Sequence, residues 1–314
     1  MRHRRSLDLF DDAKVSRCTT STIDVLLMCL LMFCTNFVIL LLISLTNAYR
    51  RHKQTTKMLK LYGVPLSQPF RSVAWALLYK RHAFEVVMKV PGMGGKMGAK
   101  SPEFMEKAPL ATVPVIEEPS GLVLWESPAI LAYLADSRGW DDLYPPTSSP
   151  AARAKINSFM HWHHHGTRTL ANTLTPFFRP DLTGAVDEAG LAQRREAAAK
   201  TLETFGDVYL ARDGADFIAG SPKVSVADFL AYGEVAQLLP KYCNAMGANH
   251  SIPASVAAWC ERMQAVPHHD AVNAVLAELG DVTKPNEVAM QKRMASATKV
   301  GLGAIVEAAK AIKA

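Results

Sequence analysis

The stretch from Leu110 to Asp136 constrains the fold most, because it contains strand formers, a turn and a helix start in close succession. Residues 113–116 are rich in strand-forming side chains, and Pro119-Ser120-Gly121 predicts a turn that returns the chain into a second strand. Ser127-Pro128 then places a capping hydroxyl before a proline at the first helical position. The stretch therefore predicts a β-hairpin followed directly by a helix.

The same stretch has the chemistry to hold a small charged molecule. Free backbone N–H groups at a helix N-terminus attract a carboxylate, and Glu126 beside Ser127 could pair with a ligand ammonium. A cis Val113-Pro114 bond would turn backbone groups outward to meet an extended peptide. A capped surface hairpin with a trans proline is the structural alternative, and these residues alone leave both interpretations open.

Composition excludes several classes of protein. A chain of 314 residues that is 49% hydrophobic is long enough for about two domains with a sizeable core. The net charge of +6 comes mostly from residues 1–57, which carry nine Lys/Arg against four Asp/Glu, leaving 26 against 25 for the remainder. This near-neutral remainder argues against nucleic-acid binding, which needs a basic face on the folded part.

A long apolar run marks the N-terminal region. After a tail at 1–24, residues 25–45 would span roughly 30 Å of hydrocarbon as a helix, which predicts a single transmembrane helix. The basic linker at 46–57 follows this run, so the positive-inside rule predicts that the folded part faces the cytosol. Two alternatives remain: a cleaved signal that ends near Ala48, or translation from Met58 that yields a soluble cytoplasmic protein.

Residues 58–138 show strand and helix patterns in the order βαβ and then ββα. The first three elements are expected at Leu59–Tyr62 (strand), Pro69–Arg81 (helix) and Phe84–Val90 (strand). A glycine-rich loop and a short helix should then lead into the hairpin and its helix. This order predicts a small mixed sheet with helices on its faces, the thioredoxin-like α/β arrangement.

A linker rich in Pro, Ser and Asp covers residues 139–150, and no strand pattern recurs after it. Residues 151–280 are predicted to form an all-α domain. Its helices are expected at about 150–174, 188–211, 226–239, 252–265 and 268–279. Residues 281–314 are predicted to form a C-terminal amphipathic helix or tail, although Gly301 and Gly303 disfavour helix.

A thioredoxin-like half followed by a helical half, with Val113-Pro114, Glu126-Ser127 and the capping box Ser225-Val-Ala-Asp228 in this order, resembles the cytosolic glutathione transferases. The resemblance covers roughly residues 58–279, and LYGVPLSQPFRS at Leu61–Ser72 resembles the theta class. It implies a homodimeric enzyme that uses glutathione as co-substrate and needs no metal. It also implies a reaction in which the glutathione thiolate attacks small hydrophobic electrophiles or reduces organic hydroperoxides.

The resemblance implies roles for individual residues. Ser67 would donate a hydrogen bond to the sulfur near a helix N-terminus, because the reaction needs a thiolate and a thiol of pKa about 8.5 is mostly protonated at neutral pH. Arg168 would face the active site. Three groups of residues would meet glutathione. Glu126 and Ser127 would hold its γ-glutamyl part, Val113 and Pro114 its cysteinyl part, and Thr112 and Lys100 lie at its glycyl end. A solvated surface charge is the alternative for Lys100 and for Arg168.

Two positions depart from the theta pattern. Ala99 and Thr112 stand where a histidine and a lysine are common, which predicts weaker binding at the glycyl end. The alternative function is therefore a non-catalytic binding or scaffold module, tethered to a membrane and built on the same fold. His161 and His165 share a helix face without an acidic or cysteine partner at metal-ligand spacing, so contact with substrate is the hypothesis for the histidine cluster.

Overall fold

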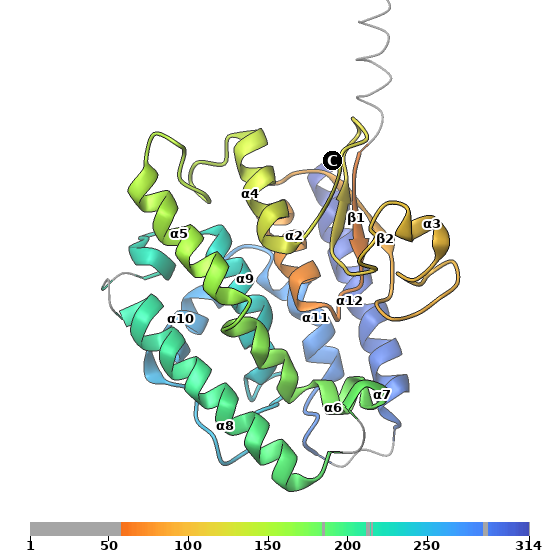
Figure 1. Ribbon diagram of the computed structural model, residues 1–314, viewed down its shortest axis with the longest axis vertical. Helices are drawn as coiled ribbons and strands as arrows, with labels where there is room; N and C mark the ends of the chain where they lie inside the picture. The colour runs from red at the N-terminus through yellow and green to blue at the C-terminus, as the bar shows by residue number, and fades with distance from the viewer. Residues whose placement is uncertain (1–57, 184–185, 212–213, 215, 285–287, 314) are drawn as a thin grey trace, which may run out of the picture. The chain divides into compact units, whose positions relative to one another are not determined.

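The computed structural model describes residues 58–183, 186–211, 214, 216–284 and 288–313 (Figure 1). The predicted tail, transmembrane helix and basic linker at residues 1–57 lie outside this set. Among the residues that are described, no helix combines the length and the apolar character that crossing a bilayer requires. Residues 58–314 cluster as one unit, which contains both of the predicted halves.

Four strands form a mixed sheet in the order β2-β1-β3-β4. The strands are β1 (Leu59–Gly63), β2 (Phe84–Met88), β3 (Val115–Glu117) and β4 (Val123–Trp125). β1 pairs parallel with β2 through the crossover helix α2 (Gln68–Tyr79) and antiparallel with β3, which pairs antiparallel with β4. The predicted thioredoxin-like order is therefore confirmed, and α3 (Pro102–Met105) is the expected short helix.

Helices make up the rest of the described chain. They are α4 (Ser127–Arg138), α5 (Pro150–His163), η1 (Thr167–Thr173), α6 (Thr175–Phe178), α7 (Pro180–Thr183), α8 (Glu188–Thr204), η2 (Phe205–Ala211), η3 (Ile218–Gly220), α9 (Val226–Val235), η4 (Ala236–Leu238), α10 (Ala254–Gln264), α11 (His269–Leu279) and α12 (Met290–Lys313). No strand follows β4 in the described residues, as the sequence predicted.

The predicted helix over 150–174 is wrong in one respect, because α5 ends at His163 and a 3-10 turn follows it. Gly166 lies so close to the ring of Trp162 that an added Cβ would come within 2.4 Å of it. The absence of a side chain at Gly166 therefore lets the chain turn sharply at this point. The break separates α5 from η1, the element that carries Arg168.

Helix α9 lies at the centre of the unit, and every one of its residues is buried. It packs against α2, where Trp75 makes tilted and edge contacts with Phe229 and Tyr232 at centroid distances of 5.0 and 5.4 Å. Such aromatic pairs add to the stabilisation from burial. The thioredoxin-like half and the helical half therefore share one hydrophobic core.

Helix α12 runs beside α11 and also contacts α2 and β2 (Figure 1). Gly301 faces this contact, since an added Cβ would lie 2.6 Å from Cβ of Val275 and 3.1 Å from Cβ of Pro65. Gly303 is exposed, and an added Cβ would meet nothing within 4 Å. Both glycines disfavour helix on sequence grounds, but only Gly301 permits close packing; Gly303 makes no such contact.

Replacing each glycine with alanine should have opposite effects. We expect Gly301→Ala to lower the free energy of unfolding by about 1–3 kcal/mol, because a methyl group overpacks the contact with Val275. We expect Gly303→Ala to raise it by about 0.5–1 kcal/mol through helix propensity. Urea unfolding of both variants measures the difference, and equal shifts of the same sign would contradict this packing.

Candidate active site

A cleft of about 780 Å³ lies between the two halves. One side is formed by the start of α2, the loop before β3 and the start of α4, and the other by the end of α5, η1 and α6, with α12 also contributing. Seven of the eight predicted site residues line it: Ser67, Thr112, Val113, Pro114, Glu126, Ser127 and Arg168. Lys100 is exposed and is not among the lining residues.

Ser67 is the N-cap of α2. Its Oγ accepts a long 3.5 Å hydrogen bond from the backbone N–H of Phe70, and within the described chain no acceptor takes its hydroxyl hydrogen. The side chain is half-buried at the cleft wall. The hydroxyl is therefore available to donate to an anion at a helix N-terminus, where the helix dipole also favours negative charge.

The Val113-Pro114 peptide bond is cis, which confirms the hypothesis drawn from the sequence. Both residues line the cleft. Neither backbone group of Val113 is hydrogen-bonded to another described residue. An extended ligand could therefore use them as strand partners, in the way that a peptide adds to a sheet edge.

Glu126 and Ser127 differ from the expected capping arrangement. Glu126 occupies the N-cap of α4, Ser127 is the first helical residue, and neither side chain makes a capping hydrogen bond. Glu126 has φ 67° and ψ 109°, a conformation that costs a non-glycine residue about 1–3 kcal/mol. Its exposed carboxylate has no partner in the described chain, so the site offers an anion beside a buried hydroxyl and a helix N-terminus.

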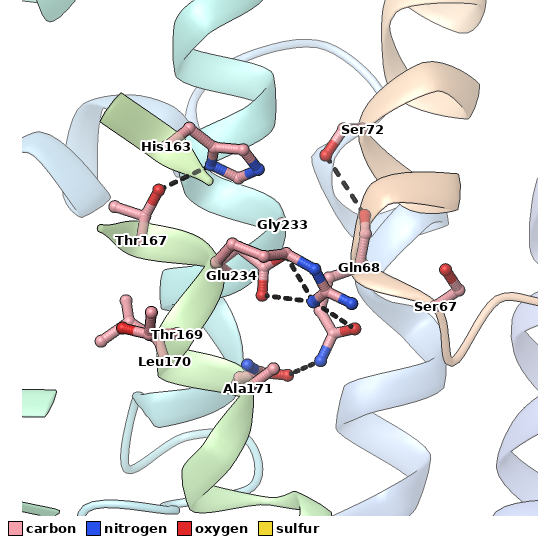
Figure 2. A network of polar contacts seen from close by, with 12 residues as sticks. Ser67, Gln68, Ser72, His163, Thr167, Thr169, Leu170, Ala171, Gly233 and Glu234 are labelled. Carbon is pink, nitrogen blue, oxygen red and sulfur yellow. Dashed lines mark hydrogen bonds and ion pairs between the residues drawn. The ribbon is translucent and has the colours of Figure 1, made fainter. Parts of the chain in front are cut away.

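Arg168 of η1 also lines the cleft, and its guanidinium is hydrogen-bonded to Glu234 and Gln68, whose side chains are labelled in Figure 2. Its Nη1 donates to Oε1 and Oε2 of Glu234 at 2.9 and 3.2 Å and to Oε1 of Gln68 at 3.4 Å. Gln68 donates in turn from Nε2 to Oε1 of Gln237 at 2.6 Å. Gln68, Glu234 and Gln237 were not predicted from the sequence, although a second carboxylate in the apolar helix α9, beyond the capping-box Asp228, was a signal.

Burial governs the charge state of Glu234. Its side chain is 1% exposed, and burial raises its pKa to about 7, although the charges of Arg168 and Arg71 act in the opposite direction. The side chain of Arg168 is 41% exposed, so solvent shares in stabilising its charge. If the Glu234 carboxylate were removed, water would therefore still solvate the Arg168 guanidinium.

This burial predicts a pH-dependent difference in stability. The folded-state pKa of Glu234 lies above the ordinary 4.5, so its contribution favours folding below about pH 4.5 and is lost as the pH rises through about 7. The expected result for Glu234→Gln is a gain in stability over wild type that grows across this window. Unfolding curves at pH 5 and pH 8 test this; Asp228, whose pKa burial also raises, contributes equally to both proteins.

Two histidines at the end of α5 line the same wall. His163 is buried, its Nδ1 lies 2.7 Å from Oγ1 of Thr167, and burial lowers its pKa to about 3. It is therefore neutral at physiological pH. His164 also lines the cleft, whereas His161 and His165 do not. Contact with substrate therefore stays a prediction for His163 and His164 only. No cluster in the described chain could hold a metal ion.

The remaining wall of the cleft is largely apolar. Side chains from the β2–α3 loop, η1, α6 and α12 contribute to it: Met93, Ala171, Leu174, Phe178 and Met294. A cavity that combines such a wall with a few convergent polar groups suits a small organic molecule. The cavity thus combines the polar groups of Ser67, Glu126 and Ser127 with an apolar surface.

Comparisons with known proteins agree with this geometry. The sequence model for the glutathione S-transferase N-terminal domain matches residues 61–140. Among solved structures, the apo form of human glutathione S-transferase T1-1 is similar over 77% of this chain and 99% of its own, with 25% identity and a TM-score of 0.56. Human glutathione transferase theta-2, solved in complex with glutathione, shares the fold with a TM-score of 0.61 at 22% identity, over 81% of this chain and 99% of its own.

Curated relatives from Arabidopsis thaliana are similar across the described unit. Glutathione S-transferase T2 is 31% identical over 250 residues, which is 77% of this chain but 40% of the relative. The chain thus spans well under half of that protein. Glutathione S-transferase T1 is 30% identical over 244 residues, which is 72% of this chain and 96% of the relative. Because this match extends over nearly the whole of an established member, the chain belongs to the glutathione S-transferase family.

Proposed function

We propose that this protein is a glutathione transferase that conjugates the glutathione thiolate to small hydrophobic electrophiles. The observation that carries this proposal is the Ser67 hydroxyl, which lies at the N-terminus of α2 on the cleft wall and has no acceptor in the described chain. Membership of the family and the glutathione complex of human theta-2 support glutathione as the co-substrate. The same site could reduce organic hydroperoxides with the thiolate.

The two ends of glutathione would meet unequal partners. At the γ-glutamyl end, Glu126 would accept from the ammonium, while Ser127 and the α4 N-terminus would hold the carboxylate. Val113 would pair through its backbone with the cysteinyl part. At the glycyl end Thr112 lines the cleft but Lys100 does not, and Ala99 is 0% exposed. We therefore infer that binding energy comes mainly from the γ-glutamyl half.

Ser67 would stabilise the thiolate rather than act as a nucleophile. A thiol becomes more acidic when a donor and a helix N-terminus favour its anion, and the nucleophile needed for attack is the thiolate. The positive charge of Arg168 on the opposite wall acts in the same direction. Hydrogen bonds that form only as negative charge develops on sulfur lower the barrier to the chemical step.

The apolar wall would select the electrophile. Met93, Leu174, Phe178 and Met294 offer a surface for an aryl or alkyl group facing the sulfur position. The neutral imidazole of His163 adds a hydrogen-bonding group without a charge that would have to be desolvated. This combination favours uncharged substrates with one polar atom near the reacting carbon.

Purified full-length protein should turn over glutathione with an aromatic halide or with an organic hydroperoxide. Steady-state assays with both substrates, and a glutathione titration by calorimetry, measure activity and affinity separately. Glutathione binding without turnover of either substrate would favour the second candidate, a non-catalytic binding module. The observation that favours this candidate is the reduced set of partners at the glycyl end, where Lys100 is not a lining residue.

We also propose that residues 25–45 anchor the protein in a membrane with the folded unit in the cytosol, and that the protein is a homodimer. The apolar run and the basic residues after it support the anchor. Mass spectrometry of the mature N-terminus tests the anchor against a cleaved signal and a start at Met58. Light scattering in detergent tests the dimer.

A further inference from the structure

The buried carboxylate of Glu234 lies behind the cleft rather than in it. Glu234 belongs to α9, is 1% exposed, and does not line the cleft. Burying a carboxylate with a single ionic partner is costly, and an apolar side chain at such a place is often neutral or stabilising. A buried carboxylate at position 234 is therefore not explained by a gain in stability.

The contacts of Glu234 converge on one residue. Both of its oxygens accept from Nη1 of Arg168, at 2.9 and 3.2 Å. The other nearby cation, Arg71, is fully buried but donates to backbone oxygens instead: Pro65 at 3.0 Å, Leu66 at 3.2 Å and Gly233 at 2.7 Å. Among the described residues, Arg168 is thus the side chain to which the carboxylate is hydrogen-bonded.

The network continues to the residue beside Ser67. Gln68 accepts from Arg168 at 3.4 Å and donates to Gln237 of η4, the short 3-10 turn that directly follows α9. Gly233 permits the close approach of α9 to α2, since an added Cβ would lie 2.9 Å from the backbone oxygen of Gln68. Glu234 of α9 therefore binds Arg168, while Gln237 of η4 binds Gln68 at the start of α2.

We propose that Glu234 is a positioning residue, which aims the Arg168 guanidinium into the cleft and, with Gln237, fixes Gln68 beside Ser67. This inference rests on the proposed glutathione transferase activity. Glu234 is not a lining residue of the cleft, so any effect on the reaction would pass through its hydrogen-bond partner Arg168. Burial of the Glu234 carboxylate lowers the stability of the fold but positions the Arg168 guanidinium, and functional sites commonly show such a cost.

Kinetics of Glu234→Gln in the full chain test this role. We expect kcat to fall about tenfold, because a loosened Arg168 no longer meets the reacting atoms, while KM for glutathione changes by less than about threefold. The melting temperature should be unchanged or higher. Asp136→Asn is the matched control, since it removes a carboxylate from the Arg153–Asp136 ion pair, and neither of these residues lines the cleft; its kcat should equal that of wild type.

A double-mutant cycle with Arg168→Ala separates positioning from a structural effect. If Glu234 acts through Arg168, adding Glu234→Gln to Arg168→Ala should leave kcat unchanged within about twofold. Wild-type kcat in Glu234→Gln, or an additional loss in the double variant, would overturn the inference and leave the proposed function intact. A wild-type chain without any glutathione turnover would overturn both.

Discussion

Ser67→Ala should lower kcat/KM about a hundredfold, the usual effect of removing one donor aimed at a developing anion. The hydroxyl is the donor on the cleft wall at the start of α2, and its structural capping bond to Phe70 is long at 3.5 Å. KM for glutathione should change by less than about threefold, because Glu126, Ser127 and Val113 remain in place. Steady-state kinetics with an aromatic halide measure both quantities.

Two further variants separate the chemistry of Ser67 from helix capping. Glycine is nearly as good an N-cap as serine but has no hydroxyl, whereas threonine keeps the hydroxyl. Ser67→Gly should therefore lose as much activity as Ser67→Ala while staying more stable, and Ser67→Thr should recover activity. Activity that follows stability across the three variants would mean that Ser67 is only a cap.

Asp228→Ala should lower the free energy of unfolding by about 3–5 kcal/mol, because it leaves several buried donors without an acceptor. The carboxylate is 0% exposed and accepts from the backbone N–H groups of Ile218 and Ser225 at 3.0 and 2.9 Å, from Ser225 Oγ at 2.7 Å and from Trp259 Nε1 at 2.9 Å. It thus joins η3, α9 and α10. Urea unfolding measures the loss.

The control for Asp228→Ala is Ser225→Ala, which removes only the hydroxyl of the capping box. Its expected cost is about 1 kcal/mol. Burial raises the pKa of Asp228 to about 6, so the carboxylate is mostly ionised at neutral pH, and Asp228→Asn would place an N–H₂ group against donors. A loss below about 1 kcal/mol in Asp228→Ala would show that the four contacts do not hold these helices together.

Much of the fold follows from local patterns in the sequence. The strands at residues 59–63, 84–88 and 115–117 lie where β-branched and aromatic residues predict them, and the capping box marks the start of α9. The break after α5 was not predicted, because the reason for it is the contact between Gly166 and Trp162. The role of Gly301 likewise depends on α11, which a helix pattern cannot show.

Parts of the site could be predicted where a single short segment of the sequence determines the local backbone conformation. The cis bond before Pro114 and the helix starts at Ser67 and Ser127 belong to such segments, although Glu126 takes the N-cap position expected for Ser127. The Arg168–Glu234 pair joins positions 66 residues apart. Helix α9 is buried on all sides, so no amphipathic pattern shows which way Glu234 faces.

Ser67 is expected to make the thiol of bound glutathione more acidic. A pH titration of the ultraviolet absorbance of the bound thiolate measures this pKa directly, in wild type and in Ser67→Ala. We expect the wild-type complex to titrate at least one unit below the value of about 8.5 for a free thiol, and the variant to return toward that value. An identical pKa in the two complexes would contradict the assignment of Ser67.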